Sequence, residues 1–194
     1  MKTQFVSRSI GGAVALACLG FSTAALADRN CSGTIGPITI EDNVVVQNAR
    51  CTLSGTIVKG NVLVYSGGRL TLLGAQIEGN IQAKDAISVT VEPNTCVDGD
   101  IQFEELKAGA YAANVRYNTV GGNIQMTKNT LTKLSLLSNR VDGDLQAFEN
   151  RSSSALIIRA NNIRQNLQRK SNDRAPMGGA NIVGGSKEDQ CRNL

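Results

Sequence analysis

Apolar and polar residues along this chain recur around a short motif that consists of glycine, Asn or Asp, an apolar residue and glutamine. Its members begin at Gly79, Gly99, Gly122 and Gly143, with a degenerate one at Gly60 and one that has lost its glycine at Gln165. Successive members are 19 to 23 residues apart, and a period of this length is typical of a solenoid. Five members in phase indicate a repeat architecture.

Each repeat places one apolar residue two positions before the glycine and another two positions after it. The first set is Val58, Ile77, Val97, Val120, Val141 and Ile163, and the second is Ile81, Ile101, Ile124, Leu145 and Leu167. Even spacing predicts strands with alternate side chains inward, and runs such as 70–72 and 134–136 predict a further strand per repeat. No stretch after residue 27 resembles a capped amphipathic helix, and 103–113, where the repeat is longest, is predicted to be a loop.

Such a short strand repeat cannot bury its apolar face alone, so successive coils must stack about 4.8 Å apart. The sequence therefore predicts an all-β protein: one parallel β-helix, or β-solenoid, of about six or seven coils over residues 28–168. Residues 169–194 contain several glycines and are predicted to form a C-terminal tail or cap.

Residues 1–27 have the features of a secretory signal peptide. Lys2 and Arg8 form a positive start, residues 10–26 are apolar, and Ala-Leu-Ala at 25–27 provides small residues for cleavage. We therefore expect export to the periplasm, the cell surface or the medium. An uncleaved anchor and lipidation at Cys18 stay open as alternatives. No later segment is long and apolar enough to span a bilayer, so the mature chain is not predicted to be membrane-spanning.

Charge and aromatic content limit the classes of partner. Removal of residues 1–27 takes away two positive charges and no negative ones, so the formal net charge of +4 becomes +2. So small a charge argues against nucleic acid as a partner. The mature chain has no Trp and few aromatic residues for stacking on bases or sugars. It also lacks a phosphate-binding loop, and no cofactor is predicted.

A polar face is predicted along the stack, because the second and fourth positions of the motif point outward. Its residues are Asn80, Gln82, Asp100, Gln102, Asn123, Gln125, Asp144 and Gln146. Aspartates alternate with neutral asparagines along it, which roughly doubles the separation of the carboxylates and reduces their repulsion. This face is the predicted binding surface.

A second column of amides lies four positions before the motif glycine. Its members are Asn118, Asn139 and Asn161, with Thr95 one coil earlier. Parity places these side chains inward, where an amide can bond to the backbone of neighbouring coils. We interpret the column as structural, with a stack that binds a ligand as the alternative.

Acidic pairs at Asp98 and Asp100 and at Asp142 and Asp144 suggest two sharper hypotheses. Calcium prefers several oxygen ligands, which these residues could supply, but no full ligand loop surrounds them. Paired carboxylates also cleave acidic polysaccharides in large β-helix enzymes, but no long loops are evident here to wall a cleft. Histidine, the commonest proton shuttle, is absent from the chain. A solvated polar edge is the simpler interpretation of both pairs.

The mature chain has four cysteines. Cys31 and Cys51 are 20 residues apart, which is one coil, and are predicted to form a disulfide in an oxidising compartment. Cys96 has another phase and Cys191 lies in the tail. A group of cations, Arg164, Arg169, Lys170 and Arg174, marks the last coil. We interpret it as a solvated end cap, with contact to an anionic envelope polymer as the alternative.

The motif repeats, together with the glycine pairs and Lys-Glu-Asp-Gln-Cys at 187–191, resemble those of small exported bacterial right-handed parallel β-helix proteins, mostly uncharacterised. The resemblance covers nearly all of the mature chain and implies a fold and an envelope or secreted location, with no catalytic residue. In those proteins a cysteine follows the last Asn-Leu-Gln and can pair with the tail cysteine. Arg169 stands there in this chain, which leaves Cys191 to pair with Cys96 or to remain free.

The function predicted from these observations is a non-enzymatic exported module, structural or binding, whose partner is an envelope polysaccharide or a protein. The alternative is a small β-helix enzyme, a lyase or hydrolase, that acts on acidic polysaccharide.

Overall fold

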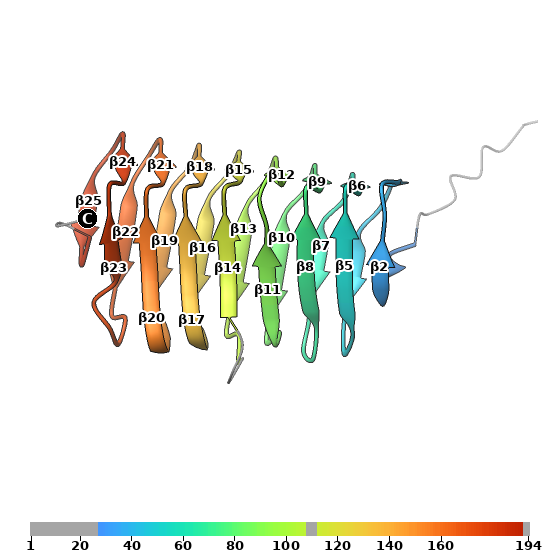
Figure 1. Ribbon diagram of the computed structural model, residues 1–194, viewed down its shortest axis with the longest axis horizontal. Coiled ribbons are helices and arrows are strands. Elements are labelled where there is room, and N and C mark those ends of the chain that lie inside the picture. Colours follow the sequence, from blue (N-terminus) through green and yellow to red (C-terminus); the bar gives the residue numbers. More distant parts are fainter. Residues whose placement is uncertain (1–26, 108–111, 192–194) are drawn as a thin grey trace, which may run out of the picture.

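The computed structural model describes residues 27–107 and 112–191, and in this part of the chain it shows three parallel β-sheets and no helix. The strands wind in order through sheets A, B and C, and each coil contributes one strand to each sheet (Figure 1). The coils stack along one axis, with the first and last described coils at opposite ends (Figure 1). The predicted parallel β-solenoid is therefore confirmed.

Each inner strand pairs with strands of the coils on either side, and the strands at the two ends of a sheet pair on one side only. Sheet A contains β1 (Arg29–Asn30), β4 (Val44–Val46), β7 (Val62–Val64), β10 (Ile81–Lys84), β13 (Ile101–Glu104), β16 (Ile124–Thr127), β19 (Leu145–Phe148), β22 (Leu167–Lys170) and β25 (Lys187–Asp189). Sheet B contains β2 (Gly33–Ile35), β5 (Arg50–Ser54), β8 (Arg69–Leu73), β11 (Ser88–Val91), β14 (Ala112–Arg116), β17 (Thr130–Leu137), β20 (Arg151–Arg159) and β23 (Met177–Gly179). Sheet C contains β3 (Thr39–Ile40), β6 (Ile57–Val58), β9 (Gln76–Ile77), β12 (Cys96–Val97), β15 (Thr119–Val120), β18 (Arg140–Val141), β21 (Asn162–Ile163) and β24 (Ile182–Val183).

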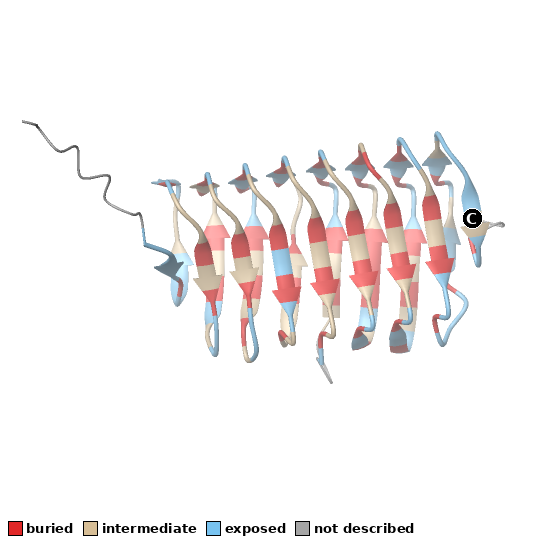
Figure 2. Ribbon diagram, turned by 180° about the vertical axis from the view of Figure 1, so that it is seen from behind, coloured by how far each residue is buried: buried red, intermediate tan, exposed pale blue. Residues whose placement is uncertain are grey.

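The core is a set of apolar columns that run along the solenoid axis. Ile81, Ile101 and Ile124 are in register in sheet A and fully buried. The predicted apolar residues before the glycine form a second buried column in sheet C. Figure 2 shows buried segments repeated at matching places in successive coils. Each coil covers the apolar side chains of the next, which explains why no single repeat could fold alone.

The solenoid has about eight turns rather than the predicted six or seven. The additional strands come from the two ends, where the motif is absent. Strands β1 to β3 form a first coil. After residue 168, β23 and β24 complete the coil that β22 begins, and β25 adds a further strand to sheet A. Backbone pairing continues the sheets there without the repeat pattern, so a motif count could not detect these coils.

The segment 103–113 was predicted to be a loop, and this prediction is wrong at both ends of the segment. Phe103 is buried in β13, and Ala113 is buried in β14. Both positions continue the alternating pattern of their neighbours, Met126 and Leu134. The predicted signal peptide lies outside the described residues except for Ala27, and so does Cys18.

Charged residues occupy positions at both ends that are apolar inside the stack. Arg29 is in register with Val44, and Lys187 is in register with Leu167. Both are exposed. Charges at inward positions oppose the addition of a further apolar coil, which is a known protection of exposed sheet edges.

The predicted disulfide is confirmed. Cys31 and Cys51 are bonded, with their Cα atoms 5.6 Å apart, and both are buried in the first two coils. The bond joins the terminal coil, which has only one neighbour, to the coil that follows it.

Candidate functional site: the outer face of sheet A

The second position of the motif forms a hydrogen-bonded column at the start of the sheet A strands. The Oδ1 atom of each Asn or Asp accepts the backbone N–H of the equivalent residue one coil later: Asn80 accepts from Asp100 at 2.8 Å, Asp100 from Asn123 at 2.7 Å, and Asn123 from Asp144 at 2.8 Å. Asn123 also donates its side-chain amide to Asp100. These side chains are half-buried, and one oxygen of each serves the backbone of the next coil.

The packing of this column explains why glycine occupies the first position of the motif. A Cβ at Gly79 would lie 2.6 Å from the carbonyl oxygen of Gly60 and 2.7 Å from Oδ1 of Asn61. Both distances are shorter than ordinary contacts, so a side chain here would push the amide of the previous coil away from its N–H partner, Asn80. Glycine and the following amide therefore act together in closing each turn.

The glutamine column lies outside, on the strands themselves. Gln82, Gln102, Gln125, Gln146 and Gln168 are in register on β10, β13, β16, β19 and β22. Gln82 is exposed and the other four are half-buried. Amides bond between neighbours, from Gln82 to Gln102 at 3.2 Å and from Gln146 to Gln168 at 2.7 Å. The structure thus presents a row of amides spaced by one strand, about 4.8 Å, on one sheet face.

A neighbouring column adds aromatic and charged groups to the same face. Lys84, Glu104, Thr127, Phe148 and Lys170 are in register there. Tyr65 directly follows β7, and its N–H donates to the carbonyl of Val46, which places it in the coil before Lys84. The sequence alone did not identify this column, because its residue types differ from coil to coil.

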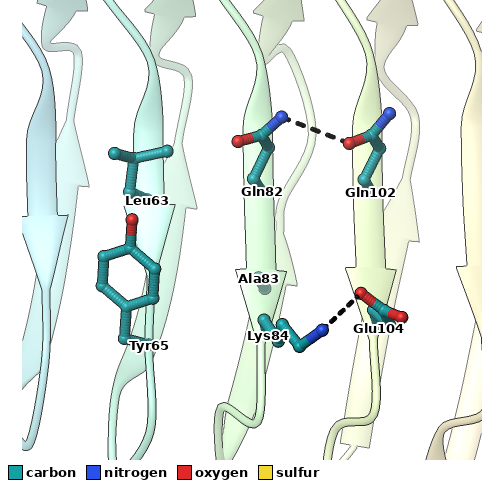
Figure 3. Close-up of a pocket in the computed structure, with 7 residues that line it drawn as sticks. All are labelled: Leu63, Tyr65, Gln82, Ala83, Lys84, Gln102 and Glu104. Carbon is teal, nitrogen blue, oxygen red and sulfur yellow. Dashed lines mark hydrogen bonds and ion pairs between the residues drawn. The ribbon is translucent and has the colours of Figure 1, made fainter.

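A depression of about 280 Å³ lies between these two columns, on β7, β10 and β13 (Figure 3). It is lined by Leu63, Tyr65, Gln82, Ala83, Lys84, Gln102 and Glu104. Its residues come only from β7, β10 and β13 and the position after β7, so no long loop forms its wall.

An ion pair neutralises the charges in this depression. The Lys84 Nζ lies 3.1 Å from Glu104 Oε2, and this contact raises the pKa of Lys84 above its ordinary value. The depression therefore combines an aromatic ring, two amides and a balanced pair of charges.

The four aspartates considered as calcium ligands have different surroundings in the structure. Asp100 and Asp144 belong to the hydrogen-bonded column, and Asp142 lies 3.5 Å from the Arg140 guanidinium. Asp98 is exposed after β12. Within residues 27–107 and 112–191, no group of three or more His, Cys, Asp or Glu side chains is arranged to hold a metal ion.

The inward amide column forms a continuous hydrogen-bonded ladder. Asn118 Oδ1 accepts the N–H of Thr95 at 3.1 Å, and Asn139 Oδ1 accepts the N–H of Asn118 at 3.2 Å. Their amide groups donate to the strand carbonyls of Val91 and Val115. All of these Asn side chains are buried, and their bonds are to the protein itself.

A third amide column was missed in the sequence. Asn129, Asn150 and Asn172 stack in the same way at the turn between sheets A and B, and Asn129 Oδ1 accepts the N–H of Leu106 at 3.0 Å. Each lies five positions after the apolar residue of the motif. That constant offset was the available signal.

The C-terminal end differs from the predicted solvated cap at one residue. Arg169 is 1% exposed, because it alternates inward with Leu167 along β22, and its Nε donates to Cys191 Sγ at 2.8 Å. Burial lowers the pKa of the Arg169 guanidinium and raises that of the Cys191 thiol, while their mutual contact acts in the opposite direction for each. Cys191 is thus a buried free thiol, and Cys96 is an exposed one.

No helix in the described part of the chain is long and apolar enough to cross a membrane. No protein-family model, curated protein or solved structure matches this chain.

Proposed function

We propose that the protein is a non-enzymatic exported module of the cell envelope or medium that binds an extended polymer along the outer face of sheet A. The observation that carries this proposal is the register of five glutamines on five successive strands. A row of identical amides with a constant spacing suits a partner that also repeats.

The surrounding geometry supports binding rather than catalysis. Asp100 and Asp144, the acids nearest the glutamines, each accept a backbone N–H through one oxygen and so have a structural task. Acid–base cleavage needs two carboxyl groups that converge on one bond inside a groove. Here the column of acids and amides lies at the edge of a strand-built face.

A binding screen with envelope polysaccharides and envelope proteins, with and without calcium, tests the proposal. We expect mature protein to retain at least one polymer, and the triple variant Gln102→Thr, Gln125→Thr and Gln146→Thr to lose it. Threonine keeps the strand preference and removes the long amide.

The matched control makes the reverse exchange on another face. Thr52, Thr71 and Thr90 are in register on sheet B, half-buried and outward. Replacing all three with glutamine should leave binding intact. Equal binding by both triple variants, or no bound polymer in the screen, would overturn the proposal.

A further inference from the structure

We propose that the depression beside Tyr65 is a subsite for one sugar ring of an uncharged linear glycan, which runs along the solenoid axis and reaches Phe148. This inference rests on the function proposed above and specifies its ligand.

The Tyr65 ring is placed as a stacking platform. It is 42% exposed, and Figure 3 shows it face-on in a view onto the outside of sheet A, with its hydroxyl toward Leu63. An exposed flat ring offers apolar contact to the C–H face of a pyranose, while the edge of that sugar remains free for polar contacts.

The polar groups around the ring suit hydroxyl groups. Gln82 and Gln102 provide amide donors and acceptors on the two strands after Tyr65. Gln82 donates one N–H to Gln102 Oε1, and Gln102 donates one N–H to Asp100 Oδ2, which leaves the Gln82 Oε1 and the second N–H of each amide for a ligand. A depression with one apolar surface and a few convergent polar groups is the usual form of a small-molecule site.

The balanced charge of the depression beside Tyr65 indicates an uncharged sugar ring at this subsite. Lys84 and Glu104, the charged residues that line the depression, pair with each other at 3.1 Å. A polyanion would find no free cation here, and a polycation would find no free carboxylate. A nucleic acid needs several phosphate contacts from cations, so it does not fit this site.

A second aromatic platform lies in the same column. Phe148 lines another depression, of about 390 Å³, with Thr127, Lys128, Glu149, Lys170 and Ser171. Four strand steps, from β7 through β10, β13 and β16 to β19, separate the coils of Tyr65 and Phe148. At about 4.8 Å for each step, the two rings are about 19 Å apart along the axis.

This spacing favours a chain of several sugars over a single ring. A protein partner would bury a continuous apolar centre. On this face, in contrast, two aromatic rings are separated along the axis, and the glutamine amides lie on the strands between them. A linear glycan can stack on both rings and meet the glutamine row between them. Contacts at two platforms of one ligand strengthen each other, because the second forms at high effective concentration.

Calorimetric titration of mature protein with uncharged gluco- and manno-oligosaccharides of two to six units tests the inference. We expect the six-unit ligand to bind at least tenfold more tightly than the two-unit ligand. Tyr65→Ala should weaken binding of the longer ligand about tenfold, and Tyr65→Phe should retain most of the affinity.

Tyr117→Ala is the matched control. Tyr117 is 58% exposed but lies at a turn with φ 57°, outside sheet A, and Ala160 adopts φ 56° at the equivalent turn. Alanine is therefore tolerated there, and we expect its affinity to stay within about twofold of that of the unchanged protein. Circular dichroism and urea unfolding verify that both variants are folded.

Several results would overturn the inference. They are no binding of any uncharged glycan, equal affinity after Tyr65→Ala, or binding that disappears as salt is raised, since a neutral ligand should be nearly insensitive to screening. The binding experiments distinguish a failure of the glycan subsite from a failure of the proposed function. If a charged polymer or a protein binds and the glutamine variant loses it, the polymer-binding face stands and the glycan subsite does not.

Discussion

Replacement of Asn139 with alanine measures how much the inward amide ladder contributes to stability. Asn139 is 1% exposed. Its Oδ1 accepts the N–H of Asn118 at 3.2 Å, and its Nδ2 donates to the carbonyl of Val115 at 2.9 Å and to Asn161 Oδ1 at 3.0 Å. Alanine leaves the N–H of Asn118 and the carbonyl of Val115 without these partners.

The expected magnitude follows from those two backbone groups. A buried group that loses its partner costs about 1 to 3 kcal/mol, so we expect Asn139→Ala to lower the free energy of unfolding by about 4 kcal/mol. The control is Asn123→Ala in the outer column. Its half-buried partners can bond to water instead, so the expected cost is about 1 kcal/mol.

Urea unfolding of the purified protein measures both costs. With a slope of about 2 kcal/mol per M, the midpoint should fall by about 2 M for Asn139→Ala and about 0.5 M for Asn123→Ala. Coils of a solenoid contact only their neighbours, so hydrogen exchange should also accelerate first in β15 and β18. A cost below about 1 kcal/mol for Asn139→Ala, or equal costs for the two variants, would refute the reasoning.

Three further predictions concern the disulfide, the outer acids and the tail thiol. Reduction of the Cys31–Cys51 bond should lower stability by about 3 kcal/mol in the chain-entropy account, with faster hydrogen exchange in β1 to β3. Asp100→Asn together with Asp144→Asn should change the urea midpoint by less than about 0.3 M, because an amide oxygen can accept the same N–H. Cys191 should be alkylated more slowly than the exposed free thiol and require a higher pH, because burial raises its pKa and reduces the thiolate at neutral pH.

Each of these has a measurement that can contradict it. Unchanged exchange in the first coil after reduction would show that the bond does not hold that coil. Loss of folding in the double Asp variant would mean that the carboxylates have a role an amide cannot fill, and loss of a measured lyase or hydrolase activity would contradict the non-enzymatic proposal. Mass-spectrometric mapping that finds Cys191 and the exposed Cys96 equally reactive at neutral pH would contradict the burial of the tail thiol.

The solenoid itself was predictable because its physics is repetitive. Strand parity, a constant period and Val or Ile at fixed offsets require stacked coils, and the buried columns of sheets A and C follow that expectation. The disulfide followed from the same period, since one coil separates Cys31 from Cys51. The terminal coils were not predictable in this way, because backbone pairing holds them without the motif.

The candidate site was likewise predictable from the sequence only in part. The sequence by itself determined which residues repeat, and therefore that the glutamines share one column and face outward. Only the tertiary structure decided that Tyr65 and Phe148 lie in one column beside them, that Arg169 points inward to Cys191, and that the outer acids bond to the backbone of the next coil. The physical reason is that a sequence repeat reveals the place of a residue within its coil only when the same residue type recurs at that place in each coil. Contacts between unlike residues of different coils depend on strand register and side-chain direction, which exist only once the coils are stacked.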